Sequence, residues 1–166
     1  VSRAKELGMD SIAITDHGIG MPDSPHYWHF GNFKALPETI DGVRLITGTE
    51  ANIMDFDGKL DFTPEQLRRM QWVIVSFHDT VIEPGTKQQH TNAVLNVLEN
   101  PYVDVLGHMG TPSFAFDYEA VISKCNEYHK IMEINASSYT VRKGSQENCK
   151  EIALLCKKHR VPIVVN

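Results

Sequence analysis

Apolar runs that end in a residue able to bind a metal recur along this chain at a nearly constant interval. The first four runs end 28 to 33 positions apart, at His17, Glu50, His78 and His108. This interval accommodates one strand, one helix and two loops. The carboxyl ends of parallel strands lie on one face of a sheet or barrel, where α/β enzymes carry their chemistry. We therefore expect these four side chains, far apart in sequence, to meet at one site.

Two further apolar runs follow, and each ends in an asparagine, at Asn135 and Asn166. The predicted strands therefore cover residues 11–17, 43–50, 72–78, 103–108, 130–135 and 161–166. Helical patterns separate them, over residues 63 to about 70, 90–99 and 118–129, and in an amphipathic segment that begins with Ser145 as a cap. Strands that alternate with helices predict a right-handed, parallel α/β arrangement.

The two ends of the chain are less regular than its middle. The sequence opens on a helical pattern with no strand before it and closes on a strand with no helix after it. A closed barrel takes about 200 to 250 residues, and an open six-stranded sheet leaves edges that invite association. We therefore expect residues 1–166 to form a single domain that is the internal part of a longer barrel, with self-association through exposed barrel edges as a further expectation.

Composition narrows the class of protein. The chain is 42% apolar, yet no apolar run approaches the length of about 20 residues that a membrane helix needs. Its first residues show no secretory signal, and its three cysteines lack metal-binding or redox spacing, which favours a cytoplasmic protein with reduced thiols and no membrane partner. A net charge of −5 disfavours a nucleic-acid partner but is compatible with a small phosphorylated substrate.

Three imidazoles and one carboxylate form a ligand set that suits zinc, and also manganese or iron. A single histidine is usually a hydrogen-bonded core or surface residue, but coincidence explains poorly why four candidates share one place in four successive units. Asp16 and Asp79 adjoin two of the histidines. Because neighbours on a strand point to opposite sides, these aspartates have two open roles, binding the metal or orienting a ligand or loop.

A polar loop after the fifth strand contains the elements of a phosphate-binding site. It combines hydroxyls, two cations, a glycine and the start of a helix, although each of these residues also has an ordinary use as a cap, a turn residue or solvated surface. The candidate substrate-binding residues are Asn135, Arg142, Lys143 and Ser145. A second loop, residues 21–30, is rich in aromatic residues; it is either a lid over the site or plain packing at the rim.

Taken together, these segments resemble the polymerase and histidinol phosphatase (PHP) superfamily, and most closely its stand-alone bacterial phosphatase branch. The resemblance covers essentially the whole chain. It rests on the order and spacing of short motifs: Ile14–Gly18, Pro25–Phe30, Gly48–Ile53, Phe77–His78, Gly107–His108, Glu133–Asn135 and Arg142–Ser145.

The resemblance implies a distorted (β/α)7, TIM-like barrel with three metal ions, commonly zinc, that hydrolyses phosphate monoesters. By the same resemblance, Glu50 would bridge two ions, His78 and His108 would hold one ion of that pair, and His17 would help to hold the third. Clustered cations neutralise phosphate oxygens and lower the pKa of a bound water, so no side-chain nucleophile is needed. No catalytic residue is expected beyond the metal ligands.

The sequence also departs from the family pattern. Family members begin with a strand that carries His-x-His and end with one that carries Asp-x-His, and neither occurs here. We therefore expect a PHP-type domain that lacks its first strand and its last elements, with fewer than three ions, so that the parent protein is a phosphatase and the isolated chain is inactive or weakly active. The alternatives are a PHP-type phosphodiesterase or exonuclease acting on nucleic acid, and a non-catalytic, metal-poor fragment.

Overall fold

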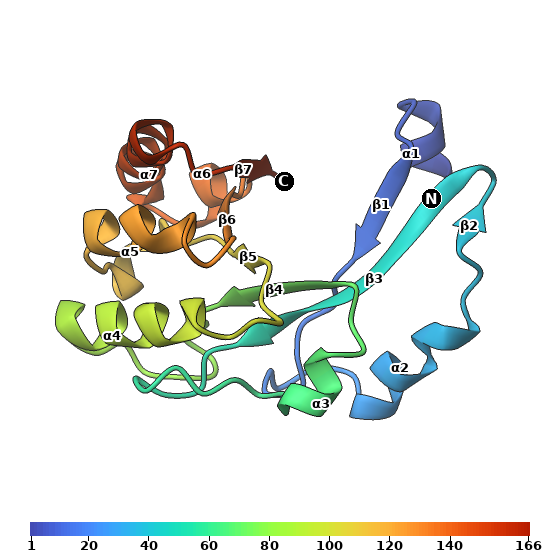
Figure 1. The fold of residues 1–166 in the computed structure, drawn as a ribbon, viewed down its shortest axis with the longest axis horizontal. Coiled ribbons are helices and arrows are strands. Elements are labelled where there is room, and N and C mark those ends of the chain that lie inside the picture. Colours follow the sequence, from blue (N-terminus) through green and yellow to red (C-terminus); the bar gives the residue numbers. More distant parts are fainter.

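A single curved sheet forms the centre of the molecule in the computed structural model, which describes residues 1–166 (Figure 1). Its strands run in the order β1-β3-β4-β5-β6-β7, all parallel, and β2 pairs antiparallel with β3. The strands are β1 (Ser11–Ile14), β2 (Thr39–Ile40), β3 (Val43–Asn52), β4 (Trp72–Ser76), β5 (Val105–Leu106), β6 (Ile131–Ile134) and β7 (Ile163–Val165). The predicted parallel α/β arrangement is confirmed. Five of the six predicted strands contain an observed strand, β3 extends two residues beyond its predicted end at Glu50, and only β2 was not predicted.

Helices cover the outer side of this sheet, and α4, α5 and α7 stack beside one another along β4 to β7 (Figure 1). The helices are α1 (Ser2–Glu6), α2 (Tyr27–Gly31), α3 (Pro64–Leu67), α4 (Lys87–Leu98), α5 (Tyr118–Cys125), α6 (Ser138–Val141) and α7 (Ser145–His159), with short 3-10 turns η1 (Asn32–Ala35) and η2 (Pro112–Phe114). Within the sheet, β1 pairs with β3 alone and β7 with β6 alone, so the sheet is a half-barrel.

The longest strand, β3, joins the two parts of the sheet. Its first half, Arg44–Thr47, pairs with β1, and its second half, Gly48–Asn52, pairs with β4. At the change of partner, a Cβ on Gly48 would overlap the carbonyl oxygen of Trp72, so only glycine permits this approach. The staggered pairing is the register offset that a barrel requires.

Capping residues explain where several helices begin. Thr86 caps α4 through a capping box with Gln89, so the helix starts earlier than its apolar face predicted. The prediction that Ser145 caps α7 is wrong. The cap is Gly144, whose φ of 90° places it in the left-handed region, and Ser145 is the first helical residue. Two short helices, α2 and α6, occupy segments that were predicted as loops.

The interior between sheet and helices is a continuous apolar cluster of 28 buried residues. Its three cysteines are free and buried, and burial raises the pKa of Cys125 to about 12 and that of Cys156 to about 11. Such thiols stay protonated at neutral pH and are poor nucleophiles. None of the helices combines the length and the apolar character needed to cross a membrane.

Candidate metal centre

The side chains at the ends of the first four predicted strands lie together around the carboxylate of Glu50. Its Oε1 atom is 2.9 Å from Nε2 of His108 and 3.4 Å from Nε2 of His78. Its Oε2 atom is 3.5 Å from Nδ1 of His17, which lies beside Glu50 across a parallel bridge just beyond β1. Each carboxylate oxygen thus faces different imidazoles.

Three of these donor atoms form a small triangle. The Nε2 atoms of His78 and His108 are 3.2 Å apart, and the other two edges, to Oε1 of Glu50, are 2.9 and 3.4 Å. The ligand atoms of a tetrahedral zinc ion are separated by roughly 3.3 Å, as bond lengths near 2.0 Å require. The three residues therefore fit one face of a zinc site without rearrangement.

A buried asparagine and a half-buried threonine orient two of the imidazoles. Nδ1 of His78 donates to Oδ1 of Asn52 at 2.7 Å, so its Nε2 presents a lone pair to Glu50. Nδ1 of His108 lies 3.4 Å from the hydroxyl of Thr111, whose own proton is donated to the His108 carbonyl. Nε2 of His108 therefore presents a lone pair, as Nε2 of His78 does. Such outer contacts fix the tautomer of ligating histidines.

His108 also has an unusual backbone. Its φ of 34° lies in the left-handed region, which a side chain with a Cβ rarely adopts, at a cost of order 1–3 kcal/mol. The amide of His108 donates to Oε2 of the buried Glu133 at 2.7 Å, and Oε1 of Glu133 accepts from the side chain of Asn166 at 3.2 Å. Glu133 therefore holds His108 in a strained conformation that points its ring at Glu50.

Glu50 is held in its ionised form. Burial by itself would raise the pKa of this carboxyl. In the absence of a metal, the imidazoles of His108 and then His78 donate to it when they carry a second proton, on Nε2, and these contacts outweigh burial and hold the pKa well below its ordinary value. The hydroxyl of Ser76 donates to Oε1 at 2.7 Å and acts in the same direction. An anionic oxygen at this position favours a cation beside it.

The part of the site around His17 is more open. The side chain of His17 is 46% exposed, against 9% for His78 and 5% for His108. Asp16 turns away from this cluster and pairs with His29, at 2.8 Å between Oδ2 and Nε2. In the aromatic loop, Phe30 is buried in the core, as plain packing requires, while Trp28 is exposed. The role of a lid stays a prediction.

A cavity of about 310 Å³ opens beside His78 and is bordered by the segment that precedes α7. Arg142 and Lys143 line it together with Asp79 and Thr111. The other two candidate substrate-binding residues do not. Oδ1 of Asn135 accepts from the amide of Ser137, and Ser145 is fully buried with a hydroxyl that has no hydrogen-bond partner.

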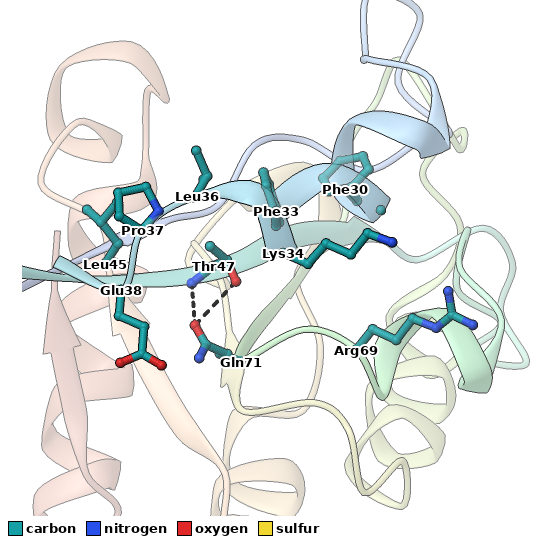
Figure 2. Close-up of a pocket in the computed structure, with 11 residues that line it drawn as sticks. Phe30, Phe33, Lys34, Leu36, Pro37, Glu38, Leu45, Thr47, Arg69 and Gln71 are labelled. Atoms are coloured by element: carbon teal, nitrogen blue, oxygen red, sulfur yellow. Dashed lines mark hydrogen bonds between the residues drawn. The ribbon is translucent and has the colours of Figure 1, made fainter. Parts of the chain in front are cut away.

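Another cavity, of about 540 Å³, lies along β3 below η1 and contains none of the four candidate ligands (Figure 2). Its wall is fixed by Gln71, whose side-chain oxygen accepts from the amide and the hydroxyl of Thr47. Although it is the larger of the two cavities, it has no contact with the imidazoles and is not the candidate site.

Sequence reasoning missed the residues that surround the ligands. Asn52 follows Glu50 by two positions, so the two share one face of β3, and a polar residue on that face was a usable signal. Glu133 gave a second usable signal, since a carboxylate inside an apolar strand requires a hydrogen-bond partner. The structure gives both residues hydrogen bonds to the candidate ligands.

The chain resembles known proteins over most of its length. The PHP domain profile matches residues 1–138. A "probable phosphatase" of Acetivibrio thermocellus is 51% identical over 161 residues, which cover 97% of this chain and 67% of the relative. A second "probable phosphatase", from Clostridium botulinum, is 46% identical over 165 residues, which cover 99% of this chain and 68% of the relative.

Among solved structures, the fold resembles histidinol phosphate phosphatase from Lactococcus lactis, determined with zinc, L-histidinol and phosphate. The TM-score is 0.62 at 14% identity, over 99% of this chain and 76% of that one. At this identity the likeness concerns the fold, and it agrees with the half-barrel described above. Because the family profile spans most of the sequence and close relatives match nearly all of it, the chain belongs to the PHP domain family.

Proposed function

We propose that this chain forms the metal-bearing part of a metal-dependent phosphatase that hydrolyses small phosphate monoesters. One observation carries the proposal: acceptor atoms of Glu50, His78 and His108 converge within 3.4 Å of one another, with no lysine or arginine among the ion-pair partners of Glu50. The names of the relatives, and the zinc and phosphate bound by the Lactococcus lactis protein, support the same reaction class.

Electrostatics explains why the cluster needs a cation. His78 commits its Nδ1 proton to Asn52, so a neutral ring turns a lone pair toward the Glu50 carboxylate. Lone pairs and a carboxylate this close repel one another unless a positive charge lies between them. A divalent ion there would polarise a phosphate oxygen and lower the pKa of a water molecule.

The other residues of the site would bind and orient the substrate. A cavity of about 310 Å³ suits a small phosphorylated compound, and Arg142 and Lys143 on its wall would pair with phosphate oxygens. Nη1 of Arg142 lies 3.1 Å from the hydroxyl of Ser138, which steadies the guanidinium. The buried, protonated cysteines offer no nucleophile, so attack by water is the reaction that these residues support.

The principal test is hydrolysis of a generic aryl phosphate by variants of the complete protein. Replacing His78 or Glu50 by Ala should abolish zinc-dependent turnover while circular dichroism stays close to that of the wild type. His129→Asn is the matched control, because this exposed histidine lies at a φ of 55°, which asparagine tolerates. Full turnover in either ligand variant would rule out the metal mechanism.

A second test concerns the number of ions. Glu50, His78 and His108 supply three ligands to one position, whereas His17 is the only one of the four turned toward the other oxygen of Glu50. The 166-residue chain should therefore bind at most one zinc ion tightly. Metal analysis that finds three ions per purified chain would contradict this stoichiometry.

The phosphate-binding role of Arg142 is tested separately. Arg142→Ala should raise the inhibition constant of inorganic phosphate by roughly tenfold, the effect of losing one charge-assisted hydrogen bond. Arg68→Ala, an exposed arginine at the end of α3, is the control. An unchanged inhibition constant in the Arg142 variant would reject this part of the proposal and leave the metal site intact.

A further inference from the structure

A chain of hydrogen bonds leads from an aspartate outside the candidate ligand set to His78. Oδ2 of Asp61 accepts from Nδ2 of Asn52 at 2.6 Å, and Oδ1 of Asn52 accepts from Nδ1 of His78 at 2.7 Å. Asn52 is fully buried, so neither end of its amide can turn to solvent instead. The side-chain amide of Asn52 therefore lies between an acceptor, Asp61, and a donor, His78.

The carboxylate determines which way this amide points. An ionised carboxyl accepts hydrogen bonds and cannot donate them, so the NH2 group of Asn52 must face Asp61 and its oxygen must face His78. The imidazole consequently carries its proton on Nδ1. Its Nε2 lone pair is then directed at the position where Glu50 and His108 converge.

Asp61 is also packed against the loop that follows His17. Oδ2 of Asp61 accepts from the amide of Gly20 at 2.8 Å, and Oδ1 accepts from the amide of Asn52 at 2.9 Å. A Cβ on Gly18 would collide with both carboxylate oxygens, and one on Gly20 would be within 3.2 Å of the Asp61 side chain. Both glycines thus allow the loop to lie directly on Asp61.

We propose that Asp61 is a positioning residue for the metal centre, which acts through Asn52 to select the Nδ1-protonated tautomer of His78. The proposal rests on the proposed function in one respect, namely that Nε2 of His78 binds a metal. Asp61 itself is not placed to touch metal or substrate, since its hydrogen bonds go only to Asn52 and Gly20.

Asp61→Asn tests the relay with little change in shape. The oxygen of the new amide keeps the bond from the backbone amide of Asn52, so its NH2 group replaces Oδ2. The Asn52 side chain then meets a donor instead of an acceptor, which favours the inverted orientation with its oxygen toward position 61. The NH2 group of Asn52 would then face His78, whose proton would move to Nε2. The tautomer should be read in the metal-free protein from the 15N shifts of the His78 ring, assigned by their loss in His78→Gln. Zinc affinity, measured by competition with a chelator, should fall roughly 10- to 100-fold.

Exchanging the two residues provides the rescue. In Asn52→Asp/Asp61→Asn the carboxylate sits next to His78 and again accepts from Nδ1, while the amide at position 61 donates to it. The bond from the amide of Gly20 is lost in the single and the double variant alike, so only the relay distinguishes them. Asp55→Asn is the matched control, because Asp55 accepts from the amides of Asp57 and Lys59 in the same loop without reaching Asn52.

The expected result is an Nδ1-protonated His78 in the wild type and the control, an Nε2-protonated His78 in Asp61→Asn, and return of the first tautomer and most of the zinc affinity in the exchange variant. An unchanged tautomer in Asp61→Asn would overturn the relay. A changed tautomer with undiminished zinc affinity would overturn its role at the metal centre. If the wild type binds no zinc, the proposed function fails, and the metal-free spectra still decide whether Asp61 controls His78.

Discussion

Two glutamates in this molecule gather histidines, and their surroundings differ. Oε1 of Glu119, on the surface, lies 2.8 Å from Nζ of Lys158 and 2.7 Å from Nε2 of His159. Glu50 is largely buried among three imidazoles, with no lysine or arginine among its ion-pair partners. The lysine completes the charge balance at Glu119, whereas at Glu50 we propose that an ion from outside does so. Histidines around a carboxylate therefore indicate a metal site only where no resident cation competes.

The largest effect is expected when the charge of Glu50 alone is removed. Glu50→Gln keeps the shape of the side chain but removes the anion that faces the imidazoles, so zinc affinity should fall by more than about 100-fold, beyond the usual effect of outer-shell changes. Isothermal titration calorimetry measures it. If Glu50→Gln bound zinc as tightly as the wild type, the claim that Glu50, unlike Glu119, needs a metal ion would be wrong.

A smaller effect should separate the buried and exposed parts of the centre. His108 is anchored at its amide and is nearly inaccessible, whereas His17 is 46% exposed and faces the other oxygen of Glu50. His108→Ala should therefore reduce affinity for the first zinc ion roughly tenfold more than His17→Ala does. The same calorimetric titration compares them, and equal losses would mean that the two imidazoles serve one ion equally.

The support of His108 is expected to matter for stability as well. Glu133→Ala leaves the amide of His108 without its acceptor in a strained, buried conformation, so the free energy of unfolding should fall by about 1–3 kcal/mol. Urea denaturation of the metal-free protein measures it. Glu127→Ala, at an exposed position beyond α5, is the reference; a similar small loss in both variants would show that Glu133 is not holding His108.

The smallest effect is expected at Glu119. Hydrogen bonds from Lys158 and then His159 lower the pKa of this exposed carboxyl, so its contribution to stability is present above its ordinary value of 4.5 and is lost as the pH falls through the folded-state pKa. Glu119→Gln should leave zinc affinity unchanged. It should lower stability slightly at neutral pH, with the difference from wild type vanishing in acid. A loss of zinc binding would refute the contrast with Glu50.

Much of the fold could be predicted because strand ends are marked in the sequence. Six apolar runs with a regular interval determine a parallel sheet, and parallel strands place residues such as Glu50 and His78 on one rim. Short elements such as β2 and α6 were not predicted, because only two to four residues form each and tertiary contacts decide their conformation.

The surroundings of the candidate ligands were harder to predict than the ligands. Asp61 lies nine residues beyond Asn52 in a loop, and no periodicity connects a loop carboxylate with a strand amide. Ser145 fits a capping pattern, yet the left-handed conformation available to Gly144 gave that role to the glycine. Local sequence patterns describe strands and caps, while hydrogen bonds between distant segments depend on how those segments pack.

Because side chains alternate along β3, the orientations of the Glu50 carboxylate and the Asn52 amide depend on each other. Glu50 and Asn52 point the same way only because two residues separate them. Deleting the one residue between Gly48 and Glu50 would turn both side chains to the helix-covered side together. The candidate centre would be lost although Glu50 and Asn52 both remained in the sequence. An insertion or deletion in this strand is therefore far more damaging to the candidate centre than a substitution elsewhere in it.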